Sequence, residues 1–231
     1  MIERKTVVFG LIALVWLGAC PDPGERFDEF VERTEPFRRP PADLGESSLE
    51  ELDGRFLLTA AVELNPATPL YFDVEIETSY GGESSCPEEG CFLHMKVLPL
   101  VSPHLLEPGC PEAFTPTAIA LGETIPDEAR QNPQPIEIRD IPVRGDGSFL
   151  AQLPLVAVDG CANSISGRPI VARLALNSVT KSTDRFCGLL QGEIFDPLEM
   201  TLTRSTFGAE RIEDDPLDLD PRPILPACPA P

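Results

Sequence analysis

Basic side chains are scarce in this 231-residue chain, which has 18 lysines and arginines against 38 aspartates and glutamates and a formal net charge of −20. A phosphate backbone is bound by clustered Lys and Arg, so this balance excludes nucleic acid as a partner. It also argues against adsorption on an anionic lipid surface, which would repel the chain. A soluble, self-repelling surface explains the acidity, although cations or a basic partner would also suit it.

Catalytic motifs are scarce as well. The chain has two histidines, His94 and His104, and contains no Gly-x-Ser-x-Gly, no His-Glu-x-x-His and no glycine-rich phosphate loop. The Ser-x-x-Lys of Ser178–Lys181 matches penicillin-recognising enzymes, but that motif works on a helix and here is expected in a polar loop after a strand. Asp184 and Glu193 are a candidate carboxylate pair, which a solvated surface explains as well. We therefore predict no catalytic residue, no bound metal and no cofactor.

Long apolar runs are also missing. An uncharged, mostly apolar run, Thr6 to Leu17, follows Arg4 and Lys5 and is shorter than the ~20 residues that a membrane-spanning helix needs. Small residues follow it, so residues 1–19 read as a signal peptide that is removed. Removal would take away one acidic and two basic side chains, leaving 37 acidic and 16 basic and a net charge of −21.

The end of this segment, Leu17-Gly18-Ala19-Cys20, resembles the lipobox of bacterial lipoproteins. The resemblance covers only the first twenty residues and implies that the Cys20 thiol carries a diacylglyceryl group. With further acylation, palmitate for example, Cys20 would hold the protein firmly to a bilayer, because each buried CH₂ contributes ~0.8 kcal/mol. The alternative is an ordinary secretory signal with Cys20 near the cut. Pro21, where an Asp would favour inner-membrane retention, implies the outer membrane, facing either the periplasm or the surface.

Two segments are expected to lie outside the folded domain. Residues 20–48 are rich in Pro and charge and read as a flexible, disordered tether, with an amphipathic helical turn over 26–34 as the alternative. Residues 213–231 form an acidic, Pro-rich tail, for which weak calcium binding is the alternative to disorder.

The domain between them, residues 49–212, reads as all-β. Period-two alternation is clearest in Tyr71–Glu77, where apolar and acidic residues alternate, so one face is buried and the other is wet. Short strands bounded by turn residues predict an antiparallel β-sandwich or barrel. The predicted strands are 56–64, 71–78, 92–100, 136–143, 149–158, 170–177, 189–195 and 200–206.

The two halves of the domain, 49–104 and 136–209, also resemble each other. Asp53-Gly54-Arg55-Phe56-Leu57 is echoed by Asp146-Gly147-Ser148-Phe149-Leu150, and prolines and cysteines follow in the same order. The spacings differ, so either a duplication or the chance recurrence of Asp-Gly turns explains the likeness.

Six cysteines follow Cys20, and an even number in an exported chain reads as disulfides. Six cysteines allow fifteen pairings; a local bridge across the turn between the first two is plausible. If the halves stack with matching ends together, Cys110 pairs with Cys161, which leaves Cys187 with Cys228 by elimination. A zinc site of Cys86, Cys91, His94 and Cys110 is the alternative, though its spacing matches no zinc pattern. The candidate disulfide residues are Cys86, Cys91, Cys110, Cys161, Cys187 and Cys228.

Two polar segments, Asn163–Gly167 and Ser205–Gly208, read as loops that either bind a ligand or only form turns. The whole pattern is similar to uncharacterised envelope lipoproteins with a β-rich domain. It predicts a non-catalytic binding or structural module that contacts the bilayer through Cys20 and an unknown protein or glycan partner. The alternatives are an envelope-polymer hydrolase that uses carboxylates and a structural part of a larger envelope complex.

Overall fold

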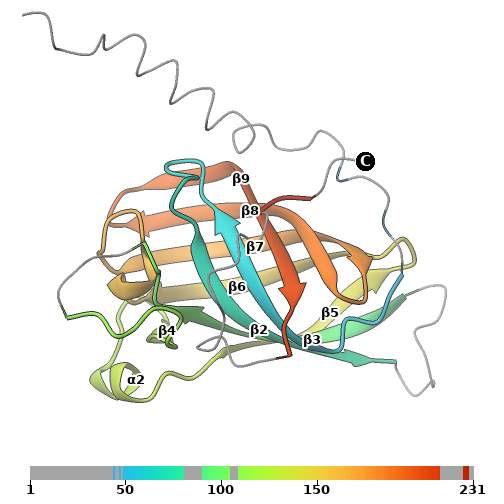
Figure 1. The fold of residues 1–231 in the computed structure, drawn as a ribbon, viewed down its shortest axis with the longest axis horizontal. Coiled ribbons are helices and arrows are strands. Elements are labelled where there is room, and N and C mark those ends of the chain that lie inside the picture. Colours follow the sequence, from blue (N-terminus) through green and yellow to red (C-terminus); the bar gives the residue numbers. More distant parts are fainter. Residues whose placement is uncertain are drawn as a thin grey trace, which may run out of the picture. The chain divides into compact units, whose positions relative to one another are not determined.

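The structure, a computed structural model, describes residues 44, 47, 49–80, 90–104, 109–213 and 226–228, and the statements below concern these residues. They form an all-β domain, as predicted (Figure 1). The strands are β1 (Gly54–Ala61), β2 (Leu70–Ser79), β3 (Gly90–Leu100), β4 (Ile119–Leu121), β5 (Ile136–Arg144), β6 (Ser148–Val158), β7 (Ile170–Ser182), β8 (Arg185–Asp196) and β9 (Met200–Arg211). Two short helices are α2 (Asp127–Gln131) and the 3-10 turn η1 (Gly160–Ala162).

Eight of the strands close into an antiparallel barrel in which neighbours in sequence are neighbours in space. The order around the barrel is β1-β2-β3-β5-β6-β7-β8-β9, and β9 pairs with β1 to close it, with Phe56 opposite Arg211. Of the two architectures that the sequence left open, the protein has the barrel and not the sandwich. The structure does not bear on the duplication, which stays a prediction.

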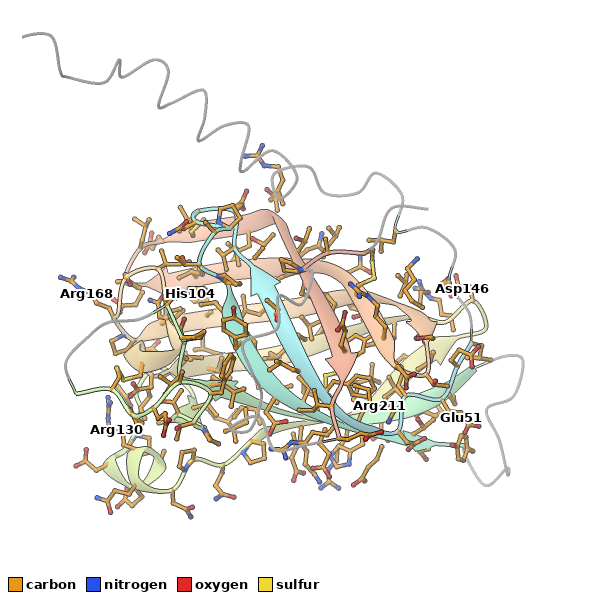
Figure 2. The ribbon with its side chains drawn as sticks, in the orientation of Figure 1. Glu51, His104, Arg130, Asp146, Arg168 and Arg211 are labelled. Atoms are coloured by element: carbon orange, nitrogen blue, oxygen red, sulfur yellow. A yellow bond between two sulfur atoms is a disulfide. The ribbon has the colours of Figure 1, made fainter. Side chains whose placement is uncertain are left out.

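The two ends of the barrel differ. We call the end with the β1–β2, β6–β7 and β8–β9 connections the mouth, and the end with the β2–β3, β5–β6 and β7–β8 connections the base. His104 and Arg168 lie toward the mouth, whereas Asp146 and Arg211 lie toward the base (Figure 2).

The wall of the barrel is irregular between β5 and β6. These strands pair at a single position, Val143 with Phe149. Toward the mouth, β4 and the segment before it lie between β3 and β6: the Thr117 N–H donates to the Pro99 carbonyl of β3, and Ile119 pairs with Val158 of β6. This added segment links β3 to β6 where β5 does not reach.

The base half of the barrel is packed by aromatic rings. Phe186 is fully buried, and its ring centroid lies 5.3 Å from that of Phe56, 5.8 Å from Phe149 and 6.0 Å from Phe207. Such edge-on pairs add to the gain from burying the rings. Leu52, just before β1, is 1% exposed in the same core. The base is therefore filled and closed by side chains.

Charged groups cover the base. The Arg211 guanidinium lies 4.9 Å from the centroid of the Phe56 ring, and its Nε donates to Oδ1 of Asp184 over 2.8 Å. It also donates to the backbone carbonyl of Asp53, whose carboxylate accepts the Thr78 N–H over 2.8 Å. The residues that lead into β1 are thus fixed to both flanking strands.

Two disulfides between described residues hold connecting and terminal segments in place. Cys110–Cys161 links the β3–β4 connection to the β6–β7 connection, and Cys187–Cys228 holds the end of the chain against β8. These are the two pairs that the sequence predicted. The Thr206 hydroxyl donates to the Pro226 carbonyl over 2.6 Å, so the segment 226–228 packs on the outer wall. Cys91 is disulfide-bonded as well.

The eight predicted strands all exist, but two polar segments were assigned wrongly. Ser178–Lys181, expected in a loop, lies within β7, and Ser205–Gly208 lies within β9. Ser178, Thr180 and Ser205 are fully buried, because the barrel accepts small polar side chains where bulky rings fill the remaining space. The sequence did not predict β4 or α2.

Several predictions fall outside the described residues. These are the signal peptide, Cys20, the alternative helix at 26–34, Cys86 and most of the acidic tail. Two tether residues are described: the Leu44 carbonyl accepts from the Lys181 Nζ, and the Ser47 hydroxyl donates to the Asp146 carbonyl over 2.5 Å. Within the described ranges, no helix has the length and apolar character needed to cross a bilayer.

Candidate functional site

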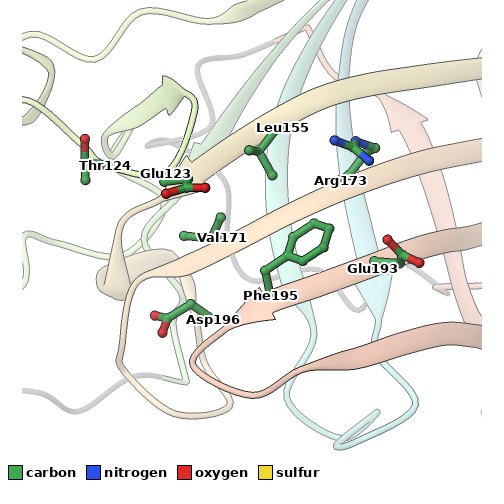
Figure 3. Close-up of a pocket in the computed structure, with 8 residues that line it drawn as sticks. All are labelled: Glu123, Thr124, Leu155, Val171, Arg173, Glu193, Phe195 and Asp196. Carbon is green, nitrogen blue, oxygen red and sulfur yellow. The ribbon is translucent and has the colours of Figure 1, made fainter.

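A groove of about 600 Å³ runs over the outer wall of the barrel on β6, β7 and β8 (Figure 3). Three strands form its floor, and the connection after β4 forms one side. The lining residues are Glu123, Thr124, Leu155, Val171, Arg173, Glu193, Phe195 and Asp196. A second hollow, of about 470 Å³, shares Arg173 and Glu193 and extends toward β9.

Strand pairing builds the floor of the groove. Leu155 of β6, Arg173 of β7 and Glu193 of β8 stand directly opposite one another, so their side chains form one row across three strands. Residues opposite one another on neighbouring strands point to the same face of a sheet. This row faces outward, whereas Leu174 and Leu176 belong to the inward face.

An irregularity in β8 adds the aromatic ring. The pairing of β7 with β8 shifts register between Val171 and Ala172, which leaves Phe195 without a direct partner. A bulge of this kind redirects a side chain. The Phe195 side chain points outward and is 40% exposed, and the Arg173 guanidinium lies over its ring at 5.9 Å from the centroid.

The side of the groove is positioned by one hydrogen bond at Gly122. Its N–H donates to the Leu155 carbonyl over 2.8 Å and continues the β4–β6 ladder by one residue. Gly122 has a φ of +92°, in the region that favours glycine, so the chain turns sharply there. Glu123 and Thr124 follow this turn and are exposed beside the apolar floor.

The groove is acidic, with three carboxylates and one guanidinium. Glu123, Glu193, Asp196 and Arg173 are all exposed. Among the described residues, Arg173 makes no ion pair within 4.0 Å; it stands opposite Glu193 in the strand register and covers the Phe195 ring. Three carboxylates around an apolar floor of Leu155, Val171 and Phe195 suit a ligand that is both apolar and positively charged.

The chemistry of these carboxylates favours binding. A carboxyl group becomes a general acid when burial in apolar surroundings disfavours its charge. The three groove carboxylates are exposed instead. Elsewhere on the barrel, the Arg139 guanidinium donates to Glu137 over 2.7 Å and lowers the pKa of that carboxyl, which keeps it ionised.

The candidate carboxylate pair is not brought together. Asp184 lies in the β7–β8 turn at the base, bonded to Arg211, whereas Glu193 lies in the groove toward the mouth. The intervening length of β8 separates them by roughly 25 Å or more. The Ser-x-x-Lys segment is also not a catalytic site, because the buried Ser178 hydroxyl donates to the Leu176 carbonyl over 3.2 Å and Lys181 bonds the Leu44 carbonyl.

The alternative zinc site is not formed either. Cys91 and Cys110 are both in disulfides. His94 lies on the outer wall, with Nδ1 at 3.8 Å from Glu77 and Nε2 at 3.6 Å from Glu137. In the part of the chain that the structure describes, no group of three or more His, Cys, Asp or Glu side chains is placed to hold a metal ion.

Sequence reasoning predicted none of the groove residues as a site except Glu193. The alternation of Val171-Ala172-Arg173-Leu174-Ala175 places Arg173 on the opposite face from Leu174, which is the one available signal. The polar loop Asn163–Gly167 was predicted better. It forms the β6–β7 connection at the mouth, where Asn163 is 2% exposed and its amide donates to the Ser166 hydroxyl over 2.7 Å.

The barrel and its outer groove define a class in structural terms only, a closed eight-stranded antiparallel barrel with a groove on its wall. No family model, no curated protein and no solved structure matches this chain. The groove is therefore the feature of this protein that bears on its function.

Proposed function

We propose that this protein is a non-catalytic binding protein of the bacterial envelope, anchored through an acylated Cys20, and that its groove binds an extended, basic segment of a partner protein. The observation that carries the proposal is the pairing of an apolar floor with three exposed carboxylates in one groove. An extended segment places alternate side chains on one side, where they can meet a flat row of strand residues.

Charge supports a basic partner over an anionic one. The chain carries a net charge of −20, and the groove holds three acids and one base. Anionic glycans, nucleic acids and lipid headgroups meet repulsion at such a surface, whereas a basic segment is attracted and steered toward it. Arg173 is occupied by the Phe195 ring and stands beside Glu193, so its charge is partly balanced.

The exposure of the groove carboxylates favours binding over hydrolysis of an envelope polymer, which was the alternative. A hydrolase needs one carboxyl group kept neutral as an acid and a second one placed beside the same bond. Exposed groups on a sheet surface serve better as partners for Lys and Arg side chains, each pair contributing ~0.2–1 kcal/mol.

Photocrosslinking in intact cells tests where the partner binds. A photoreactive benzoylphenylalanine at Thr124, on the side of the groove, is expected to capture a discrete partner, and the same group at the exposed Thr203 of β9 is the control. Capture from Thr203 with the same yield, or no capture from Thr124, would contradict a groove-specific function.

A peptide titration tests the chemistry. A labelled alternating Lys-Leu octapeptide is expected to bind, and Glu193→Gln with Asp196→Asn should weaken binding about 2- to 30-fold, from two exposed charge pairs. The charge-matched control is Glu112→Gln with Glu213→Gln, two exposed carboxylates that do not line the groove. Equal weakening by both pairs would show attraction to net charge only and would refute the site.

The anchor needs its own test. Metabolic labelling with palmitate should mark the parent chain and leave Cys20→Ser unlabelled. Protease treatment of intact cells, with a sealed-envelope control, then separates exposure at the surface from a periplasmic location. Labelling that persists in Cys20→Ser would refute lipidation at this residue.

A further inference from the structure

The β6–β7 connection crosses the mouth of the barrel. In the closed ring of eight strands, the β1–β2 and β6–β7 connections are separated by the same number of strands in either direction, so they lie on opposite sides of the mouth. Yet the Ser164 hydroxyl of the β6–β7 connection lies 2.7 Å from the Thr68 carbonyl and 3.1 Å from the Pro69 carbonyl, both at the end of the β1–β2 connection. The connection therefore spans the mouth.

This connection, which we call the lid, comprises residues 159–169. Ile165 at its centre packs against the main barrel core and is partly buried. At one end, the disulfide to Cys110 and the hydrogen bond from the Ser102 N–H to the Cys161 carbonyl, 3.0 Å long, fix the lid to the β3–β4 connection. At the far side, the Ser164 hydroxyl is the one polar group, among the described residues, that joins the lid to the β1–β2 connection. One end of the lid is covalently fixed, and the other is held by a single side chain.

A wholly apolar cavity lies in the barrel below the lid. Its lining comes from β1, β2, β3, β6, β7 and β8, so it is in the lumen and not on the wall. The lining residues are Leu58, Ala60, Phe72, Val97, Leu153, Leu174, Leu176 and Leu190. At about 20 Å³ the cavity holds little more than one water-sized sphere in this state.

The mouth half of the lumen is less tightly packed than the base half. Phe72 stands opposite Leu58, and Leu174 precedes Leu176 by two residues, so both point inward. Nevertheless Phe72 and Leu174 are only partly buried, as are Ile194 and Met200 nearer the mouth. At the base, by contrast, Phe56, Phe186 and Phe207 are fully buried. An eight-stranded barrel is either filled by side chains or just wide enough for one small ligand. Here the base half is filled, while four inward side chains of the mouth half, those of Phe72, Leu174, Ile194 and Met200, still contact solvent.

We propose that the lumen between the lid and the aromatic base is a binding site for one unbranched acyl chain. The chain enters when the lid leaves the β1–β2 connection, and it displaces the half-buried Phe72 and Leu174 side chains. The cavity lining is aliphatic and aromatic throughout, so it offers the enclosed part of a ligand no hydrogen bond and favours a hydrocarbon. An eight-stranded barrel is just wide enough for one small ligand, so a single narrow chain suits it. The polar end of the ligand stays at the lid, among Ser164 and Ser166.

The site is separate from the groove. The groove lies on outward residues of β6, β7 and β8, and the cavity is lined by inward residues of the same strands and shares no lining residue with the groove. The second hollow touches both, through Arg173 and Glu193 of the groove and Leu153 and Leu174 of the cavity. The proposal therefore does not rest on the proposed function, and the two can fail independently.

The experiment is a fluorescence titration of cis-parinaric acid, a linear fatty acid, into the full chain carrying Cys20→Ser and purified without detergent. The parent should show saturable binding with one site per chain. Ala60→Leu, which fills the cavity from a fully buried lining position, should weaken binding at least about tenfold because the acyl chain loses its apolar contacts. If that variant fails to fold, Leu174→Trp obstructs the lumen from a partly buried position instead.

Stopped-flow mixing tests the lid. Ser164→Ala removes the one hydroxyl that joins the lid to the opposite side of the mouth, so association should accelerate about fivefold, the factor that corresponds to one net hydrogen bond. Thr203→Ala, which removes an exposed hydroxyl from the outer wall, should leave the rate unchanged.

Three results would overturn the proposal. The first is a parent that does not bind the probe saturably. The second is that Ala60→Leu and Leu174→Trp both fold and bind like the parent. The third is displacement of the probe by the Lys-Leu octapeptide, which would place the probe in the groove. Unchanged association in Ser164→Ala would refute the lid as the gate.

Discussion

Removing one ring from the base of the barrel should cost far more stability than removing the same ring from its wall. Phe186 is fully buried and contacts three other phenylalanine rings, whereas Phe195 is 40% exposed in the groove. Phe186→Ala removes a buried side chain and leaves a cavity at the junction of four strands, for which measured costs are ~3–5 kcal/mol. Phe195→Ala should cost under about 1 kcal/mol, most of it the contact with Arg173.

The assay is urea unfolding followed by circular dichroism, with the disulfides kept oxidised. Tryptophan fluorescence does not serve, because the one tryptophan, Trp16, lies in the predicted signal peptide. For a domain of this size, a loss of about 4 kcal/mol lowers the Tm by roughly 8 to 16 °C. Equal losses for Phe186→Ala and Phe195→Ala would refute the argument that a ring in the base stabilises the barrel more than a ring on its wall.

Two further predictions concern a covalent link and a charge. Cys228→Ser should lower the free energy of unfolding by about 4 kcal/mol, from the loop entropy of a 41-residue separation, and release the segment 226–228 to proteolysis; an unchanged Cm in urea would contradict it. Glu137, whose pKa is lowered by Arg139, contributes stability that is present above its unfolded pKa near 4.3 and lost as the pH falls through the lower folded value. The stability difference between the parent and Glu137→Gln should therefore be constant above about pH 5 and shrink below pH 4, and Arg139→Gln should remove most of that change. A difference that grows on acidification would have the wrong sign.

Local pattern predicted the strands well, and the reason is visible in β2. Val74 and Ile76 point inward and Glu75 and Glu77 outward, so apolar and acidic residue types alternate in the sequence with the same period as the two faces of the strand. Where a strand buries hydroxyls, as at Ser178 and Thr180, the same rule fails, because small polar residues read as a loop. Whether those positions are buried is decided by tertiary packing against Phe186, which the local sequence pattern does not show.

The groove could not be predicted from the local sequence pattern, for a different reason. Its residues come from β6, β7, β8 and the connection after β4, and only the strand register brings Leu155, Arg173 and Glu193 into one row. Barrel closure was unreadable for the same reason, since it depends on pairing between β1 and β9. The disulfide pairs were predicted from the assumed stacking of two equivalent halves, an assumption that the structure leaves untested.

The pairing of the first strand with the last has a consequence for how this chain folds. All other pairings around the barrel join strands that are close in sequence. One edge of β1, however, pairs only with β9, which is translated almost a whole domain later. Until then the nascent sheet has two open edges, the arrangement most prone to pairing with another chain. Any truncation before β9 leaves that edge permanently open, so premature termination should yield aggregates and not a smaller barrel.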